Sequence, residues 1–279
     1  MKKEIDISVI IPVHKLENDI DKQLFERAYK SVSNETTVNP SKIIVVSTKD
    51  STEDVKTILS TFDNEIETLV LENTDVNTDF ASMVKFGVDK SETVYFSILE
   101  LDDEFTKTYW KHIDKYINKY QDCSLFLPLV GELSETGKFI KYSNETAFNI
   151  EVATNLSIEL GELSHTALNK TPSFLISGGV FKKDDFNEIG GIKNNIKLTY
   201  IYEYLLRATN HDQKIIVLPK LGYIHRNGRP NSITMSYLNE ETAISQDEIK
   251  FWFDTAKKEF YFKKQRNLEY KPKVETVEG

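Results

Sequence analysis

The sequence feature that most constrains the fold is a regular alternation of short apolar runs with helical patterns in the first hundred residues. The runs at 7–13 and 42–46 are rich in β-branched residues, as is typical of strands buried on both faces. Helical spacing of apolar residues follows each run. The predicted strands and helices alternate in the order 7–13, 18–33, 42–46, 55–62, 66–71, 80–88 and 94–99. This order predicts an α/β fold with a mostly parallel sheet and helices on both faces.

The second half of the chain is less regular. Apolar patterns predict helices at 109–120, 201–209 and 245–266, strands at 123–130, 174–181 and 214–218, and a loop rich in His and Arg at 223–231. The segment 144–171 is ambiguous. We expect one α/β domain over residues 1–235, followed by an amphipathic C-terminal helix and a flexible tail over 236–279.

Composition narrows the range of functions. The chain has 279 residues, a formal net charge of −9 and a single cysteine, Cys123. One cysteine excludes an intramolecular disulfide and a cysteine-based zinc site, and it favours a reducing, cytoplasmic location. The negative charge argues against a general affinity for nucleic acid or anionic membranes. No apolar run approaches the roughly 18 residues of a membrane span.

A cluster of carboxylates follows the predicted strand 94–99, with acidic side chains at Glu100, Asp102, Asp103 and Glu104. Ligands of parallel α/β sheets bind at the carboxyl ends of the strands, which is where this cluster is expected to lie. Carboxylate oxygens there suit Mg²⁺ or Mn²⁺ and, with the metal, a diphosphate. The alternative is an acidic N-terminus for the next helix, favoured by the helix dipole.

Five motifs occur in an order that resembles the family 2 glycosyltransferases of the GT-A fold. They are the strand and turn 9–14, the strand 42–46 with its polar loop, Glu100-Leu101-Asp102, the double-glycine turn 188–192, and the paired segments 205–207 and 223–232. The resemblance spans residues 5–235. It implies inverting transfer of a sugar from a nucleoside-diphosphate sugar, with a UDP-sugar favoured, to an acceptor hydroxyl. It also implies Mn²⁺ or Mg²⁺ as cofactor.

The resemblance implies which residues bind the donor. The implied set is Pro12, Val13, His14, Ser47, Asp50, Asp79, Glu100, Asp102, Gly178, Gly179, Arg226 and Arg229. The turn 12–14 corresponds to the one that borders the donor base and ribose, and Ser47 and Asp50 stand near the place of the family's paired aspartates. Two alternatives are structural, namely His14 with a local hydrogen bond only, and Asp50 or Ser51 as a helix N-cap.

The same resemblance implies the metal ligands. Asp102 corresponds to the aspartate that contacts the metal directly, Asp103 is the next candidate, and His225 corresponds to a late histidine that completes the ligand set. Arg226 and Arg229 beside it are suited to bidentate binding of the donor diphosphate. The alternative for this segment is a solvated basic loop.

A glycine pair, Gly178-Gly179, corresponds to a glycine-rich turn at which the backbone approaches the sugar. Glycine permits both the close approach and a positive φ. The alternative is a β-bulge without a ligand.

Inverting transfer needs a carboxylate that deprotonates the acceptor hydroxyl. Counting back from Arg207, the family's acidic pair falls on Tyr200 and Ile201, neither of which can act as a base. Glu203, about one helical turn further along, is therefore the candidate base. The alternative is a structural ion pair of Glu203 with Arg207 at i, i+4.

Two rival functions stay open on the sequence alone. The first keeps the fold as a catalytically inactive sugar-nucleotide or glycan-binding module. The second is an interaction protein that acts through its aromatic C-terminal helix. This helix is expected to pack either on the core of the protein itself or on a second copy, as a homodimer. For the enzyme, the acceptor is a glycan, a lipid-linked sugar or a hydroxymethylated DNA base.

Overall fold

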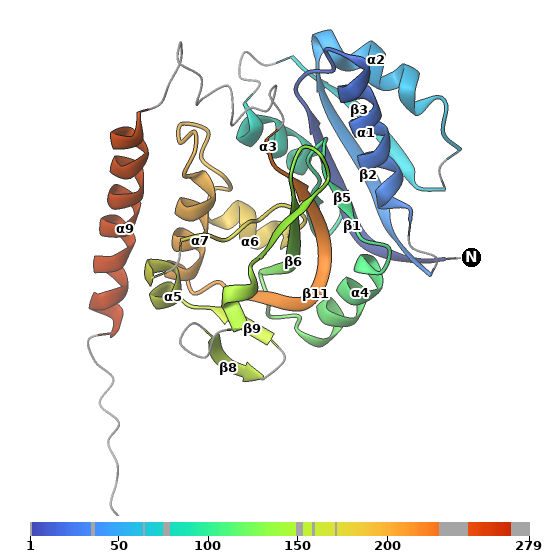
Figure 1. Cartoon of the computed structure of the whole chain (residues 1–279). Helices are drawn as coiled ribbons and strands as arrows, with labels where there is room; N and C mark the ends of the chain where they lie inside the picture. Colours follow the sequence, from blue (N-terminus) through green and yellow to red (C-terminus); the bar gives the residue numbers. More distant parts are fainter. Residues whose placement is uncertain are drawn as a thin grey trace, which may run out of the picture.

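The structure is a computed structural model that describes residues 2–34, 37–63, 65–74, 79–148, 153–157, 160–170, 172–228 and 245–268. The described strands form one 11-stranded sheet, shown in Figure 1 with helices packed on both of its faces. Its main path runs β3-β2-β1-β4-β10-β6-β11-β9-β8, while β5 pairs with β11 and β7 pairs with β6.

The first half of the chain supplies four parallel strands. They are β1 (Lys3–Val13), β2 (Val38–Thr48), β3 (Glu67–Asn73) and β4 (Tyr95–Ile98). At the carboxyl end of β1, Pro12 pairs with Val46 and Val13 with Ser47. The connecting helices are α1 (Asp19–Val32), α2 (Lys49–Leu59) and α3 (Phe80–Lys90). The α/β fold predicted from the alternating pattern is confirmed.

The second half adds strands of mixed direction. They are β5 (Glu104–Phe105), β6 (Leu125–Leu133), β7 (Phe139–Ser143), β8 (Ala153–Ser157), β9 (Leu160–Leu163), β10 (Val180–Lys182) and β11 (Ile215–Arg226). The short β10 lies antiparallel between β4 and β6, whereas β11 runs parallel to β6. The sheet is therefore parallel over its first four strands and mixed beyond them.

The remaining helices complete two layers around the sheet. They are α4 (Tyr109–Lys119), the 3₁₀ turn η1 (Glu145–Phe148), α5 (His165–Lys170), α6 (Lys183–Glu188), α7 (Tyr200–Asn210) and α9 (Gln246–Leu268). One apolar core joins the sheet to α1, α2 and α4. A second core joins the opposite face to α3, α5, α6 and α7. Successive side chains of β1 point to opposite faces, so Val9 and Ile11 enter the first core and Ile10 enters the second.

Two predicted elements in the second half of the chain differ from the structure. Only Val180–Lys182 of the predicted strand 174–181 is a strand, and the glycine pair lies in the turn before it. Residues 223–226, predicted as loop, continue β11, because they pair with both β5 and β6. Pairing with a strand on each side satisfies backbone N–H and C=O groups of this segment, which has no apolar run of its own.

The C-terminal helix α9 packs on α7 at the edge of the molecule (Figure 1). Its contact is made by Phe253, whose ring centroid lies 5.1 Å from that of Tyr202, and by the buried Ala256. Phe251 on the same helix is exposed. Among the described residues, no helix combines the length and the apolarity needed to cross a bilayer. The boundary predicted at residue 235 and the predicted tail after the C-terminal helix lie outside the described residues.

Candidate metal centre at the end of strand β4

Three of the four clustered carboxylates lie in the tight loop that joins β4 to β5, and the fourth, Glu104, is the first residue of β5. The Leu99 N–H donates to the Ile10 carbonyl at 3.0 Å, which extends the contact between β4 and β1 by one residue. The Asp103 N–H donates to the Glu100 carbonyl at 3.1 Å and closes the loop. The loop therefore begins at the carboxyl end of the parallel strands, as the sequence predicts.

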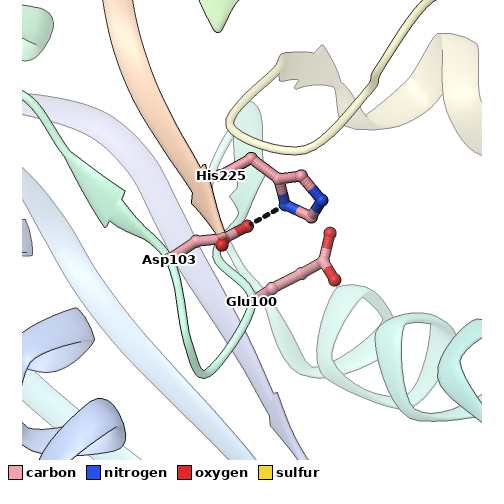
Figure 2. A group of neighbouring side chains, drawn as sticks. All are labelled: Glu100, Asp103 and His225. Atoms are coloured by element: carbon pink, nitrogen blue, oxygen red, sulfur yellow. Dashed lines mark hydrogen bonds and ion pairs between the residues drawn. The ribbon is translucent and has the colours of Figure 1, made fainter. Parts of the chain in front are cut away.

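Three side chains converge at this loop. Glu100 and Asp103 come from the loop itself, and His225 comes from β11, whose end lies beside it (Figure 2). One ligand-capable atom of each residue lies within 4.8 Å of those of the other two. The structure thus brings together two of the predicted metal ligands, Asp103 and His225, and one predicted donor-binding residue, Glu100.

Asp103 is fully buried, and its two oxygens contact two consecutive residues of β11. Its Oδ2 shares a 2.8 Å hydrogen bond with His225 Nδ1, and its Oδ1 accepts the Arg226 backbone N–H at 2.9 Å. Burial by itself lowers the pKa of His225. The charge of Asp103 and its hydrogen bond outweigh burial and raise that pKa to about 10.

Glu100 is held by two neighbours. The Ser177 hydroxyl donates to its carboxylate, and its own backbone N–H donates to the Tyr223 hydroxyl at 3.0 Å. Burial, reinforced by the nearby charge of Asp103, raises the pKa of Glu100 to about 7. A cation bound beside this carboxyl would favour its ionised form.

The donor set fits a divalent cation of the Mn²⁺ or Mg²⁺ type. The group offers carboxylate oxygens, which are hard ligands, and a single imidazole nitrogen, and its place between a buried loop and the end of β11 restricts ligand movement. Asp102 is buried in the same loop, between Glu100 and Asp103 in the sequence. It is not one of the three converging residues.

Arg226 points its charge toward a different carboxylate. Its guanidinium lies 2.7 Å from Glu104 Oε1, and the same oxygen lies 2.8 Å from Nε of Arg27 on α1. Arg226 therefore lies next to the candidate centre but engages Glu104 in this structure. Arg229, its predicted partner for the diphosphate, lies outside the described residues.

The predicted base-binding residues gather at the adjacent ends of β1 and β2. The Thr48 hydroxyl donates to the His14 carbonyl at 2.9 Å and ties the two strand ends together. Ser47 is buried at the end of β2, and its hydroxyl shares a 2.8 Å hydrogen bond with the hydroxyl of Thr52 in the first turn of α2. The N-cap of α2 is Thr48, so the alternative that placed Asp50 or Ser51 at the N-cap is wrong.

Two other predicted donor residues occupy the beginnings of helices. Asp50 is exposed in the first turn of α2. Asp79 is the N-cap of α3, where its carboxylate accepts the Ser82 N–H at 3.0 Å and the Ser82 hydroxyl at 2.9 Å. The structure thus gives Asp79 a local capping contact.

The glycine pair adjoins the candidate centre. Gly178 has a φ of +72°, and its N–H donates to the Ile98 carbonyl at 2.9 Å. A Cβ at Gly178 would lie 2.3 Å from the ring of Tyr223, so only glycine allows this close packing. Gly179 turns the chain into β10 with an N–H donated to the Ile176 carbonyl at 2.9 Å. Their predicted role toward the sugar stays a prediction.

Glu203 lies on α7 in a buried ion pair. Its carboxylate contacts the Arg207 guanidinium at 2.8 and 3.0 Å, and Lys193 Nζ at 2.8 Å. Arg207 also donates to the carbonyls of Ile189 and Gly191, in the double-glycine turn. These contacts match the structural alternative for Glu203, whose role as a base stays a prediction.

Sequence reasoning missed Ser177 and Tyr223 as partners of Glu100, and Glu132 as a neighbour of His225. Tyr223 and His225 are two residues apart, a spacing that places both on one face of a strand. That signal is usable only when the segment is recognised as part of β11. Ser177 and Glu132 carry no comparable signal, because their contacts depend on strand pairing.

Comparisons with known proteins establish the fold. Residues 1–349 of S. aureus TarS in complex with UDP-GlcNAc align with a TM-score of 0.63 and 14% identity, over 98% of this chain and 77% of that chain. The same fragment in complex with UDP gives a TM-score of 0.58 and 16% identity, over 98% and 76%. No family model and no curated protein matches the sequence. At this level of identity, the likeness establishes that the chain shares the α/β fold of TarS.

Proposed function

We propose that the protein is a glycosyltransferase of the GT-A type that uses a UDP-sugar donor and Mn²⁺ or Mg²⁺. The observation that carries the proposal is the convergence of Glu100, Asp103 and His225 at the carboxyl end of β4. It occurs in a fold shared with TarS, whose solved structures include complexes with UDP and UDP-GlcNAc. Membership of family 2 rests on the motifs of the sequence alone.

The residues of the loop would hold the metal together with His225. Of the three converging residues, Glu100 and His225 are the proposed ligands, because both oxygens of Asp103 already contact β11, at His225 and at the Arg226 N–H. Asp102 is the ligand proposed from the motif. When bound, the metal supplies positive charge that offsets the two donor phosphates and stabilises the leaving UDP. Ser177 orients the Glu100 carboxylate, and Asp103 orients the imidazole.

The acceptor half of the reaction is proposed from the resemblance. In an inverting transfer, a carboxylate removes the proton of the acceptor hydroxyl as its oxygen attacks the sugar carbon. Glu203 is the candidate that the motif order provides. The acceptor classes are a glycan, a lipid-linked sugar and a hydroxymethylated DNA base, and a homodimer through α9 is a separate proposal.

Donor binding is the direct test. Melting temperature is measured with UDP, with Mn²⁺ and with both, for the wild type and Glu100→Gln. A ligand at 100 times its Kd adds about 2.7 kcal/mol to the free energy of unfolding. We expect UDP to stabilise the wild type in the presence of Mn²⁺, and to do so weakly in the variant. An equal effect of UDP in both proteins, with and without Mn²⁺, would refute the proposed site.

The second candidate is a catalytically inactive sugar-nucleotide-binding module. The ion pair between Glu203 and Arg207 favours it, because both carboxylate oxygens of the candidate base are already engaged by cations, Arg207 on both and Lys193 on one. Release of UDP from UDP-GlcNAc, measured with and without Mn²⁺, separates the two functions. Binding without any UDP release, over a panel of acceptors from the three classes, would support the module.

A further inference from the structure

The end of β11 carries His225, and three carboxylates hold this end, one from the β4–β5 loop and two from neighbouring strands. Asp103 contacts residues 225 and 226, and Glu104 pairs with the Arg226 side chain. The third carboxylate is Glu132 on β6, which pairs directly opposite His225 in the parallel register of β6 and β11. It belongs to none of the five motifs of the sequence.

Glu132 is buried and its carboxylate has three partners. The Ser143 hydroxyl donates to its Oε1, Lys141 Nζ lies 3.5 Å from the same oxygen, and the Asn227 side-chain amide donates to Oε2 at 2.7 Å. The pKa of Glu132 lies below its usual value. Burial works against this shift, but the hydrogen bonds from Ser143 and Asn227 and the charge of Lys141 outweigh it.

Asn227 links Glu132 to the candidate centre. Its backbone N–H donates to the Leu133 carbonyl at 2.8 Å, immediately beyond the last residue of β11. The hydrogen bonds from the Asn227 side chain to Glu132 and from its backbone to Leu133 together hold Asn227 against β6. Because His225 lies only two residues before Asn227, at the end of β11, fixing Asn227 also limits the movement of the imidazole.

The orientation of the imidazole matters for the proposed metal. One ring nitrogen of His225 contacts Asp103, and Figure 2 shows the other nitrogen on the side where the Glu100 carboxylate lies. Carboxylates that bind the second nitrogen of a ligating histidine fix its tautomer and its orientation. Asp103 can do so only while the end of β11 stays in register with the loop.

We propose that Glu132 is a positioning residue that holds the end of β11, through Asn227, so that His225 faces Glu100. The effect on Mn²⁺ binding rests on the proposed metal-dependent function, whereas the anchoring of the end of β11 does not. Substitution of partners behind a metal ligand typically weakens metal binding about 10–100-fold. Glu132 acts through Asn227 and does not contact His225 directly, so we expect Mn²⁺ binding to weaken about tenfold, at the lower end of this range.

The test compares Glu132→Ala, Glu132→Gln and Asn227→Ala with Glu53→Ala, which removes an exposed carboxylate far from this strand in sequence. Two quantities are measured on each folded protein, namely the Kd for Mn²⁺ and the hydrogen-exchange rates of the Arg226 and Asn227 amides. We expect faster exchange at both amides and about tenfold weaker Mn²⁺ binding in Glu132→Ala and Asn227→Ala. Glu132→Gln should retain most of the Mn²⁺ affinity and most of the slow amide exchange, because its side-chain carbonyl can still accept the hydrogen bond from Asn227.

The outcomes separate positioning of the strand from a simple effect of charge. Equal loss of Mn²⁺ affinity in Glu132→Gln and Glu132→Ala, with unchanged exchange, would assign the effect to lost negative charge and overturn the proposal. Unchanged affinity and exchange in Asn227→Ala would also overturn it, and this variant changes a half-buried side chain at low risk to folding. If the wild type fails to bind Mn²⁺, the proposed function fails, and amide exchange alone decides whether Glu132 anchors the strand.

Discussion

Replacing Glu203 by Gln distinguishes a structural carboxylate from a catalytic one. The substitution keeps the shape of the side chain and removes its charge. In the structure this leaves Arg207 buried without its carboxylate partner, although its hydrogen bonds to the carbonyls of Ile189 and Gly191 remain. Lys193 also loses a contact of 2.8 Å, but its side chain is partly exposed and can turn to water.

The expected magnitude follows from the burial of the pair. Removing one partner of a buried ion pair typically costs about 3–5 kcal/mol, because an uncompensated charge stays in the interior. For a protein of this size, each kcal/mol lowers the melting temperature by about 2–4 °C, so we expect a decrease of about 6–20 °C. Lys193→Met removes the exposed partner and should cost less than about 1 kcal/mol.

The assay measures urea unfolding and UDP release from UDP-GlcNAc on the same preparations. A structural role predicts a large decrease in stability, with UDP release per folded molecule close to that of the wild type. A general base predicts the reverse, namely intact stability and a decrease of about 10²–10⁴-fold in turnover. An unchanged urea midpoint in Glu203→Gln would refute the inference that this carboxylate stabilises the fold by neutralising Arg207.

Three further predictions concern the candidate centre and the residues around it. Neighbouring carboxylates raise the pKa of His225 to about 10, so its protonated form stabilises the fold. This stabilisation is fully present below the unfolded pKa of about 6.5 and is lost as the pH rises through 10. In EDTA, the melting temperature of the wild type should therefore fall more steeply from about pH 6.5 to pH 10 than that of His225→Gln. Gly178→Ala should destabilise the protein more than Gly190→Ala in urea unfolding. Both glycines have a positive φ, but only a Cβ at Gly178 meets the ring of Tyr223, which adds a cost of about 1–3 kcal/mol. Equal costs in the two variants would show that the Tyr223 ring moves freely. Asp102→Ala should abolish the Mn²⁺-dependent part of UDP affinity in calorimetry while the protein still folds, and an unchanged affinity would remove Asp102 from the ligand set.

The sequence alone determined the first half of the fold and the place of the candidate site. Apolar periodicity is a local signal, so β1, β2, β3 and α1 could be located from their own residues. The carboxylate loop was predicted for the same reason, because the parallel sheet that the alternation implies puts the end of β4 at a ligand crevice.

The tertiary structure decided which side chains meet there. Glu100 and Asp103 contact residues more than a hundred positions away, and these contacts depend on β11 continuing through Arg226 between β5 and β6. That continuation has no apolar pattern of its own, since pairing with two neighbouring strands creates it. The partners of Glu132 and Glu203 were likewise fixed by strand register and by helix packing, which a single chain's local pattern does not encode.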